Sequence, residues 1–172
     1  KGSTTQDFFE RTLRGESSIS FFQTQDKPRP VASPALLCSE FSAEERIGKA
    51  LASSMDRYSQ LGMAAAIDAW SMAKLPTESG ETHDRWGVSW GTALGGTHAY
   101  EHGLKDMWLN GKERLPPMSV VLGMNNACAS HIAIKLGLGA SCLTYSIACA
   151  SAATAIGEGL NKIRRNEADL MV

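Results

Sequence analysis

The chain has 172 residues, of which 43% are hydrophobic and 20% are charged, and its formal net charge is −1. This composition is typical of one soluble globular domain that is long enough to bury a core. A net charge near zero lacks the basic excess that binding to a phosphate backbone requires, so we expect no nucleic-acid partner.

The chain carries no signal for a membrane or for secretion. Its apolar stretches are interrupted well short of the ~20 residues of a membrane span, and no basic-then-apolar leader opens it. Both ends look cut, because the chain opens at Lys1 and closes on Asp169-Leu170-Met171-Val172, which is typical of the start of a buried strand. We therefore predict part of a larger protein. Four irregularly spaced cysteines without a C-x-x-C pair favour reduced thiols in a cytosolic protein over disulfides or zinc: Cys38, Cys128, Cys142 and Cys149.

The first half of the chain predicts two helices separated by a long irregular segment. Capping and apolar spacing predict a short helix over residues 5–14, with Gly15 as its stop. Residues 16–54 contain three prolines and predict a surface excursion in which only Ala43 to Ala52 has helical character. From Met55 to Ala73, apolar residues recur at three- and four-residue intervals and predict a packed amphipathic helix with this apolar face: Tyr58, Leu61, Ala65, Ala69 and Met72.

The second half alternates strand-like and helix-like segments, which predicts an α/β layered architecture. A glycine loop over residues 91–96 links a strand to a helix, and Cys149 lies where another strand meets another helix. The predicted elements are strands over 86–90 and 143–148, and helices over 97–110, 130–136 and 150–165.

Cys149 is the candidate nucleophile, because a helix N-terminus presents unpaired N–H groups and a partial positive charge that favour a thiolate. The backbone N–H of Cys149 is also a candidate donor to the oxyanion that forms when a thiolate attacks a thioester. Small neighbours, from Ala148 to Ala153, leave room for a substrate. Taken alone, however, a strand–Cys–helix joint is a weak signal, and these residues by themselves favour a buried structural cysteine.

The surrounding motif resembles the nucleophile segment of the β-ketoacyl synthases of the thiolase superfamily. It consists of Thr144-Tyr145-Ser146-Ile147-Ala148-Cys149-Ala150-Ser151-Ala152, followed by Ala155-Ile156-Gly157-Glu158-Gly159 and by Ile163 to Val172. Four upstream segments resemble the family in the same order: Met55 to Tyr58, Gly91 to Gly96, Pro117 to Asn126 and Ser130 to Gly137. The resemblance implies an α/β thiolase-like layered fold, with a mixed sheet packed between helices. Residues 1–172 would form its N-terminal half, without the family's first strand and its C-terminal half.

The resemblance also implies an activity. Cys149 would accept an acyl group from an acyl carrier protein, and the enzyme would extend it by decarboxylative Claisen condensation with a malonyl-carrier thioester, in fatty-acid or polyketide biosynthesis. No metal or organic cofactor is implied. The expected assembly is a homodimer or a ketosynthase heterodimer, with Asn125 to Gly137 contributing to the interface. Because the family's catalytic histidines lie in the C-terminal half, this chain alone should not complete a condensation.

Four further residues are weaker candidates that follow from the resemblance. Met118 and Ile147 are candidates for the acyl pocket, and for Met118 a packed loop residue is an equal alternative. Arg46 and Lys49 are candidates for carrier-protein docking, although a solvated charge pattern explains them as well.

Two other motifs have simpler explanations. His98-Ala99-Tyr100-Glu101-His102 has the H-x-x-E-H spacing of a zinc site, but no third ligand is evident and a solvated helix face is favoured. Gly91 to Gly96 lacks the order of a phosphate-binding loop, so close backbone packing explains its glycines better.

Two alternative functions stay open. The chain could belong to a thiolase-superfamily acyltransferase that transfers acyl groups without condensation. It could also belong to a non-catalytic partner or truncated fragment that only binds another subunit.

Overall fold

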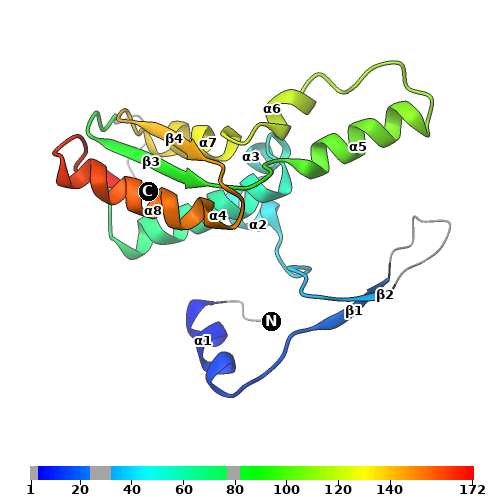
Figure 1. Ribbon diagram of the computed structural model, residues 1–172, viewed down its shortest axis with the longest axis horizontal. Helices are drawn as coiled ribbons and strands as arrows, with labels where there is room; N and C mark the ends of the chain where they lie inside the picture. Colours follow the sequence, from blue (N-terminus) through cyan, green and yellow to red (C-terminus); the bar gives the residue numbers. More distant parts are fainter. Residues whose placement is uncertain (1–3, 24–31, 77–81) are drawn as a thin grey trace. The chain divides into compact units, whose positions relative to one another are not determined.

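The computed structural model describes residues 4–23, 32–76 and 82–172. The chain divides into two compact units, residues 1–42 and 43–172 (Figure 1). The larger unit contains the candidate site. No helix in the described ranges is long and apolar enough to cross a bilayer.

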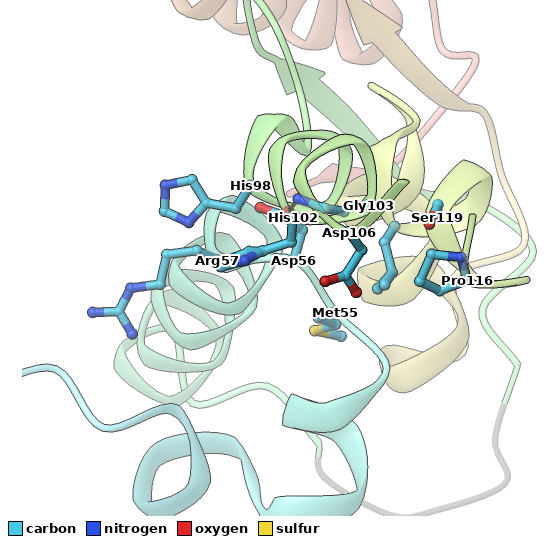
Figure 2. Close-up of a pocket in the computed structure, with 11 residues that line it drawn as sticks. Met55, Asp56, Arg57, His98, His102, Gly103, Asp106, Pro116 and Ser119 are labelled. Atoms are coloured by element: carbon cyan, nitrogen blue, oxygen red, sulfur yellow. Dashed lines mark hydrogen bonds between the residues drawn. The ribbon is translucent and has the colours of Figure 1, made fainter. Parts of the chain in front are cut away.

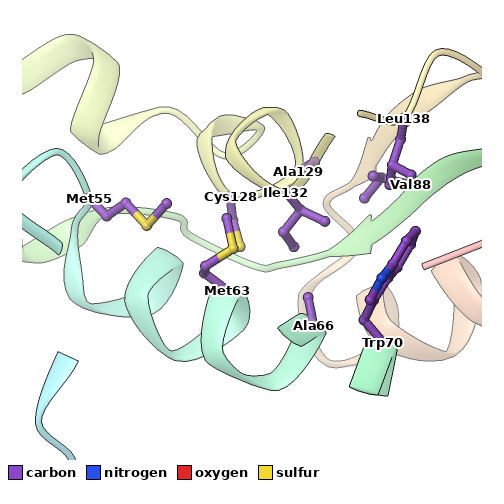
Figure 3. Close-up of a cluster of buried hydrophobic side chains, with 9 residues drawn as sticks. All are labelled: Met55, Met63, Ala66, Trp70, Val88, Cys128, Ala129, Ile132 and Leu138. Atoms are coloured by element: carbon purple, nitrogen blue, oxygen red, sulfur yellow. The ribbon is translucent and has the colours of Figure 1, made fainter. Parts of the chain in front are cut away.

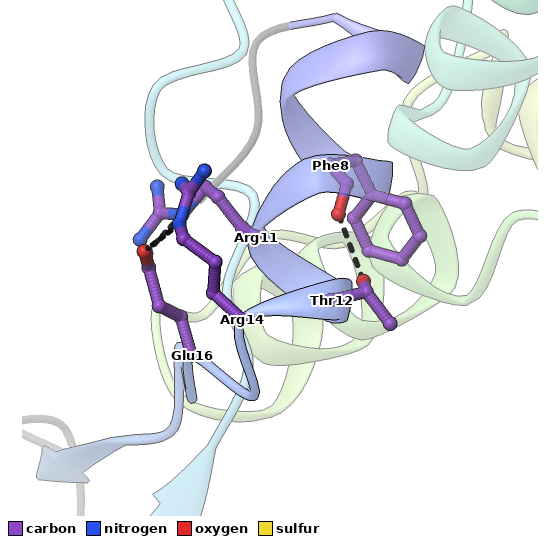
Figure 4. Close-up of polar contacts among 5 residues, drawn as sticks. All are labelled: Phe8, Arg11, Thr12, Arg14 and Glu16. Atoms are coloured by element: carbon purple, nitrogen blue, oxygen red, sulfur yellow. Dashed lines mark hydrogen bonds and ion pairs between the residues drawn. The ribbon is translucent and has the colours of Figure 1, made fainter.

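The described residues of the smaller unit form one helix and a pair of strands. Helix α1 (Thr5–Leu13) is capped by the Thr4 hydroxyl, which accepts from the Asp7 N–H, and it confirms the predicted first helix. After it, Glu16 accepts hydrogen bonds from Arg11 and Arg14, and these cations lower the pKa of Glu16 (Figure 4).

The strand pair was not predicted. Strands β1 (Ser20–Gln23) and β2 (Ala32–Ala35) pair antiparallel within the segment that the sequence assigns to an irregular excursion. Both strands are edges of a two-stranded sheet, where Pro34 is tolerated, and most of their side chains are exposed. A strand without a buried face gives no periodic apolar signal.

Two short helices precede the long helix of the larger unit. The sequence predicts one helical segment from Ala43 to Ala52, but the structure has α2 (Ala43–Ile47) and α3 (Lys49–Ser53). They are separated by Gly48, whose φ of 84° is left-handed. A helix cannot continue through that conformation, which glycine adopts without steric cost.

The long helix α4 (Arg57–Met72) is confirmed, but its predicted buried face is wrong. Ala65, Ala69 and Met72 are exposed. The buried side is rotated by about one residue, because small residues let α4 approach its neighbours: a Cβ on Gly62 would lie 2.4 Å from Trp90 and 2.5 Å from the Cys128 sulfur. The buried residues of the helix are Ser59, Gly62, Met63, Ala64, Ala66 and Trp70.

A three-stranded parallel sheet forms the centre of the larger unit. Its order is β4 (Cys142–Tyr145), β3 (Trp86–Gly91) and β5 (Leu170–Met171). The predicted strand at the end of the chain is therefore confirmed, and β3 supplies its sheet neighbour. The helices that accompany the sheet are α5 (Thr97–Trp108), α6 (Ser119–Gly123), α7 (Ala127–Leu136) and α8 (Ser151–Arg164), with a short 3-10 helix, η1 (Ala148–Ala150), before α8.

The sheet is covered on both faces, and alternate residues of β3 face different helices. Val88 faces the apolar core that α4 and α7 share, together with Met63, Cys128 and Ile132 (Figure 3). On the opposite face, the Ser89 hydroxyl donates to the carbonyl of Ala155 in α8 at 2.6 Å. The larger unit is thus a helix–sheet–helix sandwich, in which α8 is positioned directly against the central strand (Figure 1).

A candidate active site at the end of strand β4

Cys149 lies at a sharp turn between a strand and a helix. Strand β4 ends at Tyr145, and η1 leads into α8 at Ser151. Between them the backbone passes through Ile147, with φ −134° and ψ 50°, and Ala148, with a left-handed φ of 45°. We refer to residues 146–149 as the elbow. Its left-handed step at Ala148 turns the chain so that Cys149 precedes the first turn of α8.

The sulfur of Cys149 belongs to a free and exposed cysteine. By contrast, the thiol of Cys128 belongs to the apolar core. It is buried between α4 and β3, and desolvation raises its pKa to about 12. Partial burial also raises the pKa of Cys142 at the start of β4. Cys149 is the cysteine that combines exposure with a place next to the N-terminus of α8.

The elbow is held by side chains on both sides. On the helix side, the Ser151 hydroxyl accepts from the Ile147 N–H at 2.8 Å and donates to the Ala148 carbonyl at 2.7 Å. On the loop side, the Ser146 hydroxyl donates to the Ala93 carbonyl at 3.0 Å and accepts from the Asn125 amide at 3.2 Å. These contacts were not predicted from the sequence, in which a serine two residues after the candidate nucleophile is the one available signal.

Helix α8 approaches the sheet closely enough to fix the base of the elbow. A Cβ on Gly91 would lie 2.4 Å from the carbonyl oxygen of Ser151 and 2.7 Å from the Cα of Ala152. Further along, a Cβ on Gly159 would lie 3.4 Å from that of Ser89. Glycine at position 91 is therefore required by backbone proximity, which places the first turn of α8 at the end of β3.

The glycine loop after β3 packs against the segment before α7. Gly95 has a left-handed φ of 65°, and a Cβ there would lie 2.5 Å from the Asn125 side chain. The N–H of Gly96 donates to the carbonyl of Gly123 at 3.2 Å. These contacts support the interpretation of the loop as a close-packing element. Asn125 and Ala93 also contact the elbow through the Ser146 hydroxyl.

The other predicted site residues are spread over several elements. Ile147 is part of the elbow and is exposed. Met118 lies at the start of α6, which packs against α5 and α7, whereas the elbow packs against α8. Arg46 in α2 donates to both carboxylate oxygens of Asp68 in α4, at 2.7 and 2.5 Å, and Lys49 begins α3 as an exposed residue. The roles of all four residues stay predictions.

The H-x-x-E-H motif lies away from the elbow. His98 and His102 line a cleft of about 310 Å³ between the start of α4, α5 and the segment leading into α6. Figure 2 shows Asp106 pointing into this cleft toward Met55, while His98 and Arg57 project outward. Glu101 pairs with Lys105, and among the described residues no three His, Cys, Asp or Glu side chains gather as a metal-binding group.

The sequence matches the family described as beta-ketoacyl synthase, N-terminal domain, over residues 1–172. The chain belongs to this family. The resemblance seen in the sequence is thereby confirmed, and the strand–elbow–helix segment that presents Cys149 lies within the matched region.

A curated relative agrees with this assignment. The chain is 28% identical over 171 residues to "3-oxoacyl-[acyl-carrier-protein] synthase 2" of Staphylococcus aureus, which covers 99% of this chain and 42% of that protein. The chain thus spans about two fifths of the length of the curated relatives it matches.

The fold is similar to two solved ketosynthase structures. One is a type II polyketide synthase acyl-carrier protein in complex with its ketosynthase bound to the hexaketide, with a TM-score of 0.68 and 22% identity over 76% of this chain and 37% of that one. The other is the ishigamide ketosynthase/chain length factor, with a TM-score of 0.72 and 18% identity over 95% of this chain and 45% of that one. The predicted thiolase-like layered α/β fold is confirmed.

Proposed function

We propose that this chain is the nucleophile-bearing half of a β-ketoacyl synthase, in which Cys149 accepts the acyl chain during fatty-acid or polyketide biosynthesis. The observation that carries the proposal is the exposed Cys149 sulfur on a strained turn at the N-terminus of α8. The family match supports it, because it covers the whole segment from the glycine loop to the end of α8.

The first step of the proposed reaction is acyl transfer. The Cys149 thiolate attacks the carbonyl carbon of an acyl thioester on the carrier, and a tetrahedral oxyanion forms. Backbone N–H groups at the elbow, that of Cys149 among them, are suited to donate to this oxyanion. The intermediate then collapses, the C–S bond to the carrier breaks, and the carrier leaves as a thiolate that takes up a proton.

The second step is the condensation. A malonyl thioester on the carrier loses CO₂, and the electron pair of the broken C–C bond forms a carbanion. This carbanion attacks the acyl carbonyl on Cys149, a new C–C bond forms, and the thiolate of Cys149 is released. The product is a 3-oxoacyl thioester that is two carbons longer. The groups that assist decarboxylation are expected outside this chain. The chain supplies the nucleophile and the strand–elbow–helix segment that positions it.

An acyl carrier protein is the proposed partner, supported by the similar ketosynthase that is in complex with one. Arg46 and Lys49 stay the candidate docking cations. Arg46 also pairs with Asp68, so carrier binding by Arg46 would compete with that pair. Replacing Lys49 by Ala should weaken carrier binding more than replacing Arg46, as measured by the half-saturating carrier concentration in the acylation assay.

A cytosolic homodimer or ketosynthase heterodimer is the proposed assembly. The segment from Asn125 to Gly137 carries an exposed Ile134, 81% accessible, and the neighbouring edge strand β4 carries an exposed Leu143. Apolar side chains on adjacent elements are suited to an interface with a second subunit. Sedimentation of the full-length protein, compared with an Ile134→Lys variant, tests this assignment.

The proposed function is tested with radiolabelled malonyl-carrier protein and an unlabelled acyl donor. We expect the full-length protein to form a labelled 3-oxoacyl product, and we expect Cys149→Ala to form none. Cys142→Ala is the matched control, because it removes another thiol of the same strand–helix segment, and it should keep the activity. Acyl transfer without an extended product would instead favour the non-condensing acyltransferase, and an unreactive Cys149 would favour the non-catalytic partner.

A further inference from the structure

The elbow contains a strained residue whose conformation needs support. Ala148 has a φ of 45°, in the left-handed region where the Cβ of a residue other than glycine crowds its own backbone. Such conformations persist where the surrounding structure over-determines them, and they concentrate at functional sites. Ala148 is exposed, so packing of its own side chain does not hold it in place.

Ser151 contacts the backbone on both sides of this strained residue. Its hydroxyl accepts from the Ile147 N–H at 2.8 Å and donates to the Ala148 carbonyl at 2.7 Å. A serine hydroxyl has one proton and two lone pairs, so one side chain can make both bonds at once. The rotatable backbone bonds of Ile147 and Ala148 lie between the two contacted groups, and the hydroxyl therefore fixes the stretch that contains the left-handed step.

These contacts differ from ordinary helix capping. A capping side chain accepts from N–H groups within the first turn of its own helix, and α8 has no such side-chain cap. The Ser151 hydroxyl instead reaches back four residues to the chain that enters the helix. Its hydrogen bonds therefore stabilise the elbow, and they do not cap the N-terminus of α8.

Ser151 is itself held in place by the sheet. It is 4% exposed, and its carbonyl lies so close to Gly91 of β3 that a Cβ there would be 2.4 Å away. The hydroxyl therefore projects from a fixed point on the scaffold. Movement of the elbow relative to this point requires both of its hydrogen bonds to break.

We propose that Ser151 is a positioning residue for Cys149: its hydroxyl holds Ala148 in the left-handed conformation and so keeps the nucleophile at the N-terminus of α8. This inference rests on the proposed role of Cys149 as the acyl acceptor. Ser151 itself does not contact the reacting atoms. It acts through the backbone of the elbow.

The test combines Ser151→Ala with Ala148→Gly in the full-length protein. Glycine adopts a left-handed φ without steric cost, so a glycine at position 148 reduces the need for the hydroxyl. We expect Ser151→Ala to slow alkylation of Cys149 by iodoacetamide and its acylation by an acyl-carrier thioester about tenfold, the effect of roughly one strained residue. The maximal acylation rate should fall while the half-saturating carrier concentration stays the same. Adding Ala148→Gly should restore both rates to within about threefold of the parent.

Ser54→Ala is the matched control, because the Ser54 hydroxyl also donates to the carbonyl three residues before it, at 2.8 Å, far along the chain from the elbow. It should leave both rates unchanged. Equal rates in the parent and in Ser151→Ala would overturn the inference, as would a slow Ser151→Ala variant that Ala148→Gly does not restore. If Ser151→Ala fails to fold alone, folding of the double variant supports the inference, and failure of both overturns it. Alkylation needs no carrier, so it separates the two proposals. If alkylation of Cys149 slows in Ser151→Ala and recovers with Ala148→Gly, but no protein is acylated, the result would contradict the proposed function and leave the role of Ser151 intact.

Discussion

Two cysteines of the larger unit show how strongly the surroundings of a thiol determine its reactivity. Cys128 lies on α7 with no exposed surface, between α4 and β3, and burial raises its pKa to about 12. Cys149 is exposed on a strained turn in front of α8. The side chains are chemically identical, but one is a small apolar core residue and the other is available for reaction. Reactivity follows from the position of the thiol in the fold.

The largest expected difference is in the alkylation rates of these two thiols. In the native full-length protein, iodoacetamide should modify Cys149 at least about a hundredfold faster than Cys128, because Cys128 reacts only after the α4–α7 core opens. Time-resolved peptide mapping measures both rates in one sample. In denaturant the two alkylation rates should converge. Comparable rates in the native protein would contradict the different accessibility of the two thiols.

The next effect concerns the contact that fixes α8 on the sheet. Gly91→Ala should lower the free energy of unfolding by about 2–3 kcal/mol, because its Cβ would overlap the Ser151 carbonyl and the Ala152 backbone. Gly157→Ala in the same helix is the control: nothing lies within 4 Å of its Cβ position, and the substitution should be neutral or slightly stabilising. Denaturant titration measures both. Equal stability of the two variants would show that the sheet does not fix the elbow.

A smaller effect tests the buried thiol by its pH dependence. The raised pKa of Cys128 means that above about pH 8.5 the unfolded chain loses a proton that the folded chain keeps. Stability should therefore be unaffected by this group below about pH 8 and should fall by up to about 1.4 kcal/mol per pH unit above about pH 9. The difference between the parent and Cys128→Ala in urea titrations at pH 7.5, 9 and 10 isolates this contribution. A constant difference across that range would argue against a protonated, buried Cys128.

The smallest effect comes from the loop side of the elbow. Ser146→Ala removes the bond from the exposed Ser146 hydroxyl to the Ala93 carbonyl and its contact with the Asn125 amide. It should cost no more than about 1 kcal/mol of stability and slow alkylation of Cys149 less than Ser151→Ala does. Urea titration and peptide mapping give the two values. A larger effect than that of Ser151→Ala would assign the support of the elbow to the glycine loop instead of to α8.

Local patterns in the sequence predicted most of the larger unit. Strand-like alternation before Cys149 and helix formers after it located the joint correctly, although β4 ends at Tyr145 and η1 intervenes before α8. Each element is continuous in sequence, and the buried residues of α8 (Ser151, Ala155 and Gly159) recur at intervals of four, which is the condition under which periodicity is informative. The family resemblance then distinguished a nucleophile from a structural cysteine, which the pattern alone did not do.

The remaining features depend on partners that a single sequence does not identify. The buried face of α4 was predicted from its larger apolar residues, but the helix packs through Gly62 and Ser59, where Trp90 and Cys128 come close. The left-handed step at Ala148 is likewise invisible in sequence, because alanine does not favour it. It is explained by the two hydrogen bonds of Ser151, which become apparent only when the backbone of the elbow is known.

The proposed role of Cys149 as the acyl acceptor is best tested by mapping the site of acylation. The full-length protein would be incubated with an acyl-carrier thioester, digested and analysed by mass spectrometry. We expect the mass of one acyl group on the peptide that contains Cys149, and no acyl adduct on the peptides that contain Cys128 or Cys142. An adduct on another residue, with Cys149 unmodified, would contradict it.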